Sequence, residues 1–325
     1  MSTKKVAVLG EGAWGTAFAT LLTYNKYQVN VWCYHADIAY EINTYHTNKR
    51  YMPQHQLSEL LYATHDIQKA IKDIDLIFCA IPVQYLRSVC QLLADYIQPH
   101  QICISLSKGI EKDTLLLPTQ IVHQVLGAIQ TVVISGPSFA ADIMQQQPTG
   151  LVIATDNKKY STVISDTIRN HFCMPELSSD MYGIQLCGAL KNVIALGVGI
   201  LDGAGYLDNT KALFITECLQ EIGTLVEAAG GQKETVYGIA GIGDIMLSAY
   251  SKQGRNREVG WRIGKGESLD TITQETGYTP EGVNTVMSIQ QLAETLRIDL
   301  PLCQAVHDVI YASKPATYII KYMMR

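Results

Sequence analysis

The stretch Val6-Ala7-Val8-Leu9-Gly10-Glu11-Gly12-Ala13-Trp14-Gly15-Thr16 decides how the first half of this chain folds. A short apolar run enters a G-x-G-x-x-G turn, and a helix-compatible run follows. Gly10 permits a tight turn, Gly12 lets a ligand approach the backbone, and Gly15 lets the helix pack on the strand. The first N–H groups of that helix would face an anion. The order strand, turn, helix predicts a dinucleotide site, with a purely structural glycine turn as the alternative.

Short apolar runs without polar alternation recur through the first half of the chain. They cover residues 6–9, 29–33, 76–81, 102–106, 132–135 and 150–154. Runs of this kind are typical of strands buried on both faces, as in a parallel sheet covered by helices. Stretches with helical spacing, such as 16–25 and 86–96, lie between them. The alternation favours a doubly wound α/β sheet of the Rossmann type.

The pattern changes near Gly183. Residues 185–201 and 211–229 carry apolar side chains at three- and four-residue spacing, and strand-like runs end. The sequence therefore predicts an N-terminal dinucleotide-binding domain over residues 1–184. An all-helical substrate and catalytic domain is predicted over residues 185–325.

Composition places the chain among ordinary globular proteins. Its 325 residues are 47% hydrophobic and 17% charged, and the net charge of −5 gives no basic field for nucleic acid. The first apolar run is too short for a signal peptide, and no apolar stretch approaches the ~18 residues that span a bilayer. We expect a soluble cytoplasmic protein. The eight cysteines form no C-x-x-C pair and are expected to be buried thiols, and no metal motif occurs.

The sequence leaves the choice between NAD and NADP open. NAD-specific folds usually carry Asp or Glu at the end of the second strand, whereas an Arg there accommodates the phosphate of NADP. Here that strand ends in Tyr34-His35, and the first acid is Asp37. Tyr34 and His35 either contact the adenosine ribose or form a solvated loop.

Lys191 lies in the string Gly188-Ala189-Leu190-Lys191-Asn192-Val193. Burial and nearby cations can lower the pKa of a lysine toward neutrality and fit it for proton transfer. The alternative is a surface lysine on an amphipathic helix. Asn192 would orient a substrate oxygen or cap a backbone group.

Three further strings combine turns with polar groups. Residues 105–109 and 135–140 each follow a predicted strand, at the carboxyl end where α/β folds bind ligands. Gly241-Ile242-Gly243-Asp244 is followed by Gly254-Arg255-Asn256-Arg257. Guanidinium groups match phosphate oxygens, so this third string predicts an anion pocket, with a solvated surface as the alternative.

These strings, in this order, resemble the NAD(P)-dependent glycerol-3-phosphate dehydrogenases of the bacterial type. The matching pieces are G-x-G-x-W-G-T-A at 10–17, N-x-x-Y-M-P at 48–53, S-K-G at 107–109, S-G-P-S-F-A at 135–140, G-A-L-K-N-V at 188–193, D-G-x-G at 202–205, N-T-K-A at 209–212, A-G-x-G-D at 240–244 and R-N-R at 255–257. They cover nearly the whole chain, and a spaced set is far more specific than any one motif.

The resemblance implies a role for each matching residue. Lys191 would give and take the proton on the C2 oxygen, Asp244 would tune it, and Lys108 would polarise the carbonyl close to the nicotinamide. The implied substrate contacts also include Gly136, Ser138, Asn192, Ser248, Gly254, Arg255 and Asn256, the last two gripping the phosphate. The implied cofactor contacts are Ala13 and Trp14 at the pyrophosphate, Tyr34 at the ribose, Lys108, Ala140 and Arg255, and Thr279 and Glu281 on the nicotinamide side.

Three departures from the family pattern stand out. Gly254 replaces a serine found in many bacterial members, so a side-chain contact to the phosphate is absent. Tyr34 stands where the family often has an arginine near the ribose, and Glu217-Cys218 replaces a usual Arg-Gly.

The predicted activity is reversible, NAD(P)H-dependent reduction of dihydroxyacetone phosphate to sn-glycerol 3-phosphate, which supplies the backbone of glycerophospholipids. The resemblance also implies a homodimer. Two alternatives remain: a β-hydroxyacid or 6-phosphogluconate-type dehydrogenase, and a cofactor-sensing protein without turnover.

Overall fold

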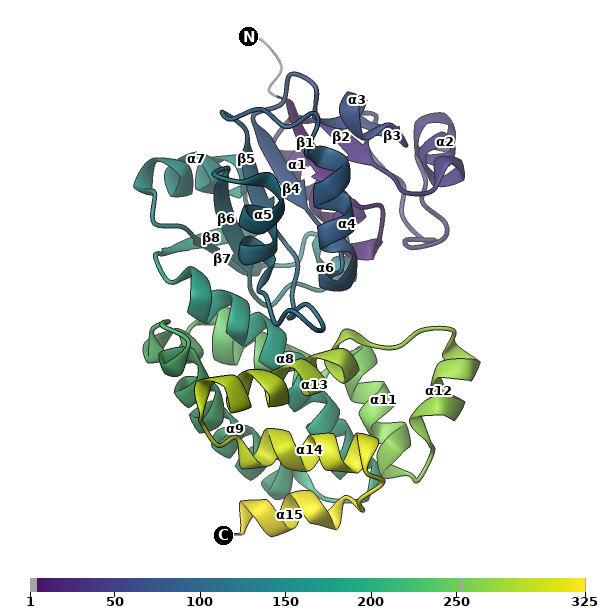
Figure 1. Cartoon of the computed structure of the whole chain (residues 1–325). Helices are drawn as coiled ribbons and strands as arrows, with labels where there is room; N and C mark the ends of the chain where they lie inside the picture. The colour runs from purple at the N-terminus through teal and green to yellow at the C-terminus, as the bar shows by residue number, and fades with distance from the viewer. Residues whose placement is uncertain (1–4, 252–253, 325) are drawn as a thin grey trace. The chain divides into compact units, whose positions relative to one another are not determined.

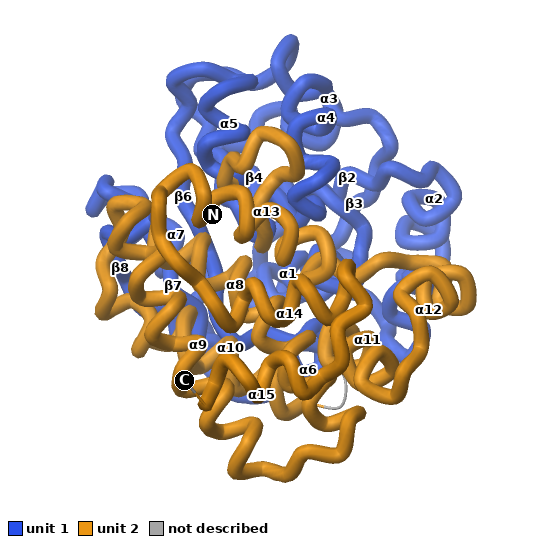
Figure 2. The backbone as a smooth tube through the Cα atoms, turned by 60° about the horizontal axis from the view of Figure 1, so that its bottom comes forward, with its two compact units in different colours: residues 1–107, 118–181 blue, residues 108–117, 182–325 orange. Residues whose placement is uncertain are grey.

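The computed structural model describes residues 5–251 and 254–324 (Figure 1). The chain divides into two compact units, coloured separately in Figure 2. Unit 1 comprises residues 1–107 and 118–181, and unit 2 comprises residues 108–117 and 182–325. The segment 108–117 was predicted to lie in the first domain, but it groups with unit 2 because Ile110 and Leu117 belong to the hydrophobic core of that unit.

Unit 1 is an eight-stranded sheet of order β3-β2-β1-β4-β5-β6-β7-β8. The strands are β1 (Lys5–Leu9), β2 (Gln28–Trp32), β3 (Leu61–Thr64), β4 (Leu76–Cys79), β5 (Ile102–Ser105), β6 (Gln130–Ser135), β7 (Thr149–Ala154) and β8 (Cys173–Ser178). The helices are α1 (Ala13–Tyr24), α2 (Ala36–Tyr45), α3 (Ile67–Ile71), α4 (Val83–Leu93), α5 (Pro118–Leu126), α6 (Ala140–Met144) and α7 (Lys158–Ile168). Helix α1 packs with α6 and α7, and α4 packs with α3 and α5, which confirms the predicted Rossmann-like fold.

The sheet differs from the predicted one in two ways. Strands β3 and β8 were not predicted, because each lies at an edge and carries polar or exposed residues such as Tyr62 and Glu176. Strand β7 runs antiparallel to β6, although a parallel sheet was expected. The connection between these strands spans residues 136–148 and contains the short helix α6. The chain turns back at the same end of the sheet, as antiparallel neighbours do.

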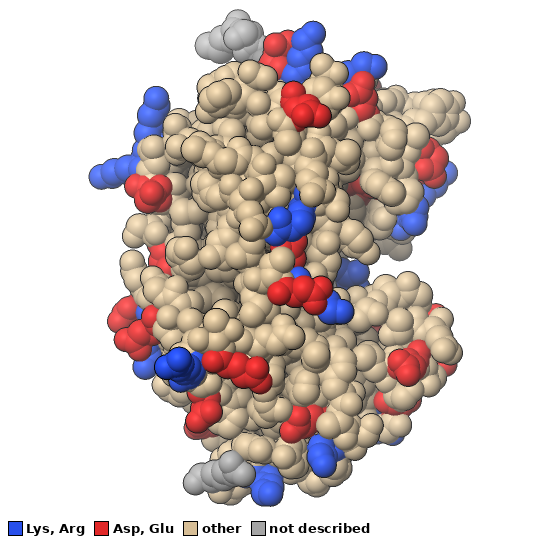
Figure 3. All heavy atoms as spheres, viewed as in Figure 1, with Lys and Arg blue, Asp and Glu red and all other residues tan. Residues whose placement is uncertain are grey.

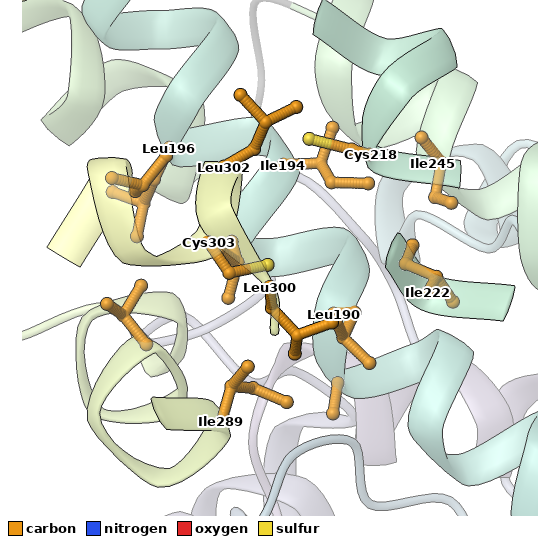
Figure 4. Packing of buried hydrophobic residues seen from close by; sticks show 14 of the residues in the cluster. Leu190, Ile194, Leu196, Cys218, Ile222, Ile245, Ile289, Leu300, Leu302 and Cys303 are labelled. Carbon is orange, nitrogen blue, oxygen red and sulfur yellow. The ribbon is translucent and has the colours of Figure 1, made fainter. Parts of the chain in front are cut away.

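Unit 2 is built from helices around α8 (Met181–Gly203), as the sequence predicted. The others are α9 (Asp208–Ala228), a 3₁₀ turn (Lys233–Tyr237), a π-helical turn (Ile239–Gly243), α10 (Asp244–Tyr250), α11 (Arg255–Gly264), α12 (Leu269–Thr276), α13 (Glu281–Leu296), α14 (Pro301–Tyr311) and α15 (Thr317–Met323). Figure 4 shows side chains of α8 and its neighbours meeting in one core, with Leu190, Ile222 and Leu302 among them.

Helix α8 corrects one sequence prediction. An 18-residue window of this helix has a mean hydropathy of 1.7, so by length and composition it could cross a membrane. Its side chains are instead buried inside unit 2 almost throughout. A helix that is apolar on all sides needs cover on all sides, and here the surrounding helices provide that cover.

Helices α8 and α11 touch through their backbones. A Cβ atom at Gly199 would lie 2.2 Å from the carbonyl oxygen of Arg257, and one at Gly260 would lie 2.2 Å from that of Leu196. Any larger residue at either position would push the helices apart. The glycines therefore fix the start of α11 relative to α8.

All eight cysteines are buried, as predicted. On the face drawn in Figure 3, positive and negative side chains are interspersed over both units. This mixture agrees with the absence of a basic excess in the sequence.

Candidate active site

Lys108, Lys191 and Asp244 meet inside unit 2. The Lys191 ammonium donates to Oδ1 of Asp244 at 2.6 Å, and the Lys108 ammonium donates to Oδ2 at 2.5 Å. Asp244 is fully buried, whereas 11% of the Lys191 side chain and 16% of the Lys108 side chain remain exposed. One carboxylate thus holds two ammonium groups and leaves both partly open to a ligand.

Each member of this group comes from a different element. Lys191 lies in the middle of α8, among buried apolar neighbours. Asp244 is the first residue of α10 and directly follows the π-helical turn, a local structure often found at functional sites. Lys108 begins the segment 108–117, which turns at Gly109 with φ of +123° and is anchored by Ile110 in the core.

Burial and charge shift the pKa values of this group. Burial, together with the neighbouring Lys191 ammonium, lowers the pKa of Lys108 to about 8, although Asp244 acts in the opposite direction. Burial acts to raise the pKa of the Asp244 carboxyl. The two ammonium groups outweigh it and hold this pKa below its ordinary value. Asp244 therefore stays ionised, while the charge on Lys108 changes with pH just above neutrality.

A polar chain links α8, α11 and α13. The Asn256 amide donates to Oδ1 of Asn192 at 3.0 Å, and its own Oδ1 accepts from the Gly282 N–H at 2.9 Å. Glu281 precedes Gly282. Burial raises the pKa of the Glu281 carboxyl, and the charges of Arg255 and of the two lysines oppose that rise. The predicted residues Asn192, Asn256 and Glu281 are therefore brought to the same region as the lysines.

The start of α11 has the features of an anion site. Gly254 is its N-cap residue, and within the described residues no side-chain cap hydrogen bond is made at this helix start, where backbone N–H groups can meet an anion. Arg255 is exposed and its guanidinium lies 5.5 Å from the centre of the Tyr278 ring. A Cβ atom at Gly254 would lie 3.2 Å from the carbonyl oxygen of Ser248, so this serine is adjacent to the turn.

The second guanidinium of the R-N-R string has a different role. Arg257 donates to Oδ2 of Asp202 at 2.7 Å, and Lys211 donates to Oδ1 of the same carboxylate at 2.7 Å. This ion cluster joins α8, α9 and α11. Arg257 thus holds the helices together, and Arg255 is the arginine of this string left open to a ligand.

The glycine loop of unit 1 fits a dinucleotide. Gly10 has φ of +112°, and a Cβ atom at Gly15 would lie 2.0 Å from its carbonyl oxygen, so both positions require glycine. A Cβ at Gly12 would meet open space, and no side chain caps α1. Ala13 and Trp14 form the first turn of α1, and among the described residues none accepts a hydrogen bond from the buried indole N–H of Trp14. The helix start therefore offers free donors for phosphate oxygens.

Other predicted residues of unit 1 lie at the carboxyl ends of strands. Gly136 follows β6 with φ of +138°, and its carbonyl accepts from the Ser138 hydroxyl at 2.9 Å. Ala140 is the first residue of α6. Tyr34 follows β2 and is 66% exposed. Thr279 lies in unit 2, shortly before α13.

Two residues of the glycine loop region were given no role from the sequence, although Asn48 begins the matching N-x-x-Y-M-P string. Asn48 is fully buried and its amide donates to the Glu11 carbonyl at 2.8 Å and to the Thr16 hydroxyl at 2.9 Å. The Glu11 carboxylate binds the backbone that follows β2. The signal for Glu11 was present, because an acid inside the loop coincides with the lack of one at the end of the second strand.

Comparison with known proteins identifies the family. The family model described as NAD-dependent glycerol-3-phosphate dehydrogenase N-terminus matches residues 5–161, and the model for the C-terminus matches residues 180–321. The chain belongs to this family. The resemblance seen in the sequence is thereby confirmed, and this glycerol-3-phosphate dehydrogenase family member is an NAD(P)-dependent oxidoreductase.

Individual relatives agree along the full chain. Proteins named as NAD(P)+ glycerol-3-phosphate dehydrogenases from Syntrophomonas wolfei and Bacillus subtilis are each 36% identical over 324 residues, which is 99% of this chain and 94% of theirs. The crystal structure of glycerol-3-phosphate dehydrogenase from Coxiella burnetii matches with a TM-score of 0.94 at 30% identity, covering 99% of each chain.

A hydroxyacid dehydrogenase shares the fold at greater distance. D-mandelate dehydrogenase in complex with NADH matches with a TM-score of 0.65 at 14% identity, covering 95% of this chain and 98% of that one. The likeness extends to the fold alone.

Proposed function

We propose that this chain catalyses reversible, NAD(P)H-dependent reduction of dihydroxyacetone phosphate to sn-glycerol 3-phosphate in the cytoplasm, for glycerophospholipid synthesis, and that it acts as a homodimer. The observation that carries the activity is the buried Asp244 carboxylate with an ammonium group on each oxygen. A ketone reduced at carbon needs a proton at oxygen, and this group offers two donors to one oxygen.

Lys191 supplies that proton to the C2 oxygen and removes it in the reverse direction. The Lys108 ammonium is a second positive group beside the same oxygen, and it stabilises the alkoxide that develops there. Asp244 keeps both ammonium groups in position. When bound, the nicotinamide supplies the hydride to carbon or accepts it.

The substrate phosphate binds at the start of α11. The exposed Arg255 guanidinium, the Asn256 amide and the uncapped N–H groups suit a dianion. Asn192 fixes the Asn256 amide, and Ser248 contributes its hydroxyl beside Gly254. Binding energy gained at the phosphate positions the ketone on the two lysines.

The glycine loop of unit 1 binds the pyrophosphate of the dinucleotide, with Gly10, Gly12 and Gly15 shaping the turn. Ala13 and Trp14 provide the first turn of α1 above it. The substrate contacts of Gly136 and Ser138 stay predictions. So do the cofactor contacts of Tyr34, Lys108, Ala140, Arg255, Thr279 and Glu281.

A spectrophotometric assay tests the activity. The purified protein is mixed with dihydroxyacetone phosphate, and the absorbance of reduced nicotinamide is followed with NADH and NADPH in parallel. Dihydroxyacetone without the phosphate is the matched control, and its kcat/KM should be lower by about 10³-fold or more because the anchoring charge is missing. If the protein binds NADH and NADPH but oxidises neither in the presence of dihydroxyacetone phosphate, the proposal is contradicted.

A further inference from the structure

The Glu11 side chain lies across the end of the second strand. Its Oε2 accepts from the Tyr34 N–H at 3.0 Å, and its Oε1 accepts from the His35 N–H at 3.4 Å and lies 2.6 Å from Nδ1 of His35. Only 5% of the residue is exposed. An acid from the glycine loop thus occupies the position that an acid at the end of the strand usually fills.

The backbone of Glu11 is held as firmly as its carboxylate. Its carbonyl accepts from the Asn48 amide at 2.8 Å and from the Thr16 hydroxyl at 3.0 Å. The N–H of the preceding residue, Gly10, donates to the Trp32 carbonyl at 3.0 Å. With both ends fixed, the carboxylate cannot swing away to make room for another anion.

The surroundings of this carboxylate are acidic rather than basic. Asp37 lies in the first turn of α2. Burial is the largest cause of the raised pKa of the Cys33 thiol, and the negative charges of Glu11 and Asp37 raise it further. In the part of the chain that the structure describes, the side chain paired with Glu11 is His35, not a lysine or an arginine.

This place matters because dinucleotide folds put the adenosine ribose at the end of the second strand. NADP carries a phosphate on that ribose, whereas NAD carries a hydroxyl. A carboxylate has about four acceptor positions, so Glu11 can accept from the hydroxyl in addition to its present partners. A phosphate would meet a like charge that can neither move nor shed its hydrogen bonds.

We propose that Glu11 is the residue that makes this chain select NAD(H) over NADP(H). The inference rests on the proposed function for its kinetic test but refers to unit 1 alone. It also explains how a chain without an acid at positions 33–35 can still discriminate.

The test compares the wild type with Glu11→Gln, which removes the charge and keeps the shape. The wild type should show a higher kcat/KM with NADH than with NADPH. The variant should lower that ratio by roughly 10- to 100-fold, mainly through a lower KM for NADPH. Asp95→Asn is the matched control, because it removes an exposed acid of unit 1 that belongs neither to the glycine loop nor to the end of β2, and its ratio should change by less than about 2-fold.

Tyr34→Arg is the second variant, in case Glu11→Gln folds poorly. The Tyr34 side chain is exposed, so the substitution leaves the core intact and places a guanidinium beside the carboxylate. It should raise kcat/KM with NADPH. No gain with NADPH, or a wild type that prefers NADPH, would overturn the inference.

Dissociation constants for NADH and NADPH, measured by fluorescence without substrate, separate this inference from the proposed function. If the protein binds both cofactors but does not turn over dihydroxyacetone phosphate, the activity fails and the ratio of the two constants still reports selectivity. An unchanged ratio in a folded Glu11→Gln variant contradicts the role of Glu11, whatever the activity.

Discussion

At the scale of single residues, the site depends on the pairing of one buried carboxylate, that of Asp244, with two ammonium groups. Two ammonium groups on Asp244 leave a net positive charge, which a lone lysine–aspartate pair would cancel. A developing alkoxide is therefore attracted to the group, and neither lysine must leave its partner to meet it. Removing Lys191 should affect turnover far more than cofactor binding, because Lys191 is not among the predicted cofactor contacts and the glycine loop belongs to unit 1.

Lys191→Met keeps roughly the length of the side chain but removes the ammonium group that carries the proton. We expect kcat to fall by roughly 10²- to 10⁴-fold, since the ketone oxygen loses its proton donor. The dissociation constant for NADH should change by less than about 2-fold. Steady-state kinetics and cofactor titration measure both quantities, and Lys314→Met, at an exposed lysine between α14 and α15, serves as control. Wild-type turnover in Lys191→Met would remove Lys191 from the reaction.

The pKa of Lys108 predicts how activity depends on pH. Lys108 is protonated below its pKa of about 8 and loses its charge above it, while Asp244 stays ionised. The kcat/KM for reduction should therefore be level near neutral pH and decline above pH 8 to 9. In Lys108→Arg the guanidinium keeps its charge throughout this range, so the decline should disappear even if the absolute rate is lower. A decline that persists in this variant would assign it to another group.

At the scale of elements, the sequence predicted those whose pattern follows from burial. The runs at 6–9 and 102–106 are apolar because both faces of a central strand are covered, and both strands form. Strand β3 was not predicted, because a strand at the edge of the sheet can carry exposed residues such as Tyr62. The assignment of Lys108 to unit 2 could not be predicted, since it depends on Ile110 packing against residues distant in sequence.

The contact between α8 and α11 gives the second kind of prediction. Gly260→Ala would place a Cβ atom 2.2 Å from the Leu196 carbonyl oxygen, so the helices must separate. We expect a loss of about 1–3 kcal/mol in the free energy of unfolding, measured by denaturant titration. The KM for dihydroxyacetone phosphate should rise, because Arg255 and Asn256 begin α11.

Gly223→Ala is the matched control for that variant. Gly223 is also buried in a helix, but an added Cβ would meet the flexible side chain of Lys233 at 3.0 Å, which can move aside. Because alanine favours the helix, stability should stay equal or rise by up to about 1 kcal/mol. Equal losses at both positions would show that the backbone contact is not what makes Gly260 necessary.

At the scale of the whole molecule, the order of the chain couples its two units. The chain leaves unit 1 after β5, contributes residues 108–117 to unit 2, and returns to unit 1 at α5. Both ends of the segment that carries Lys108 are thus tied to unit 1, while Ile110 and Leu117 are buried in the core of unit 2. If one unit unfolds, residues 108–117 lose either their flanking connections to folded unit 1 or their packing in unit 2. We therefore expect the two units to unfold together.

Calorimetry with and without NADH tests this coupling. Under the proposed function NADH binds the glycine loop of unit 1, and at about 100 times its dissociation constant it should stabilise the folded state by about 2.7 kcal/mol. If the units unfold together, a single transition should move to higher temperature as a whole, in the wild type and equally in Lys191→Met. Two transitions, of which NADH shifts only one, would show instead that residues 108–117 can detach from unit 2 without unfolding unit 1.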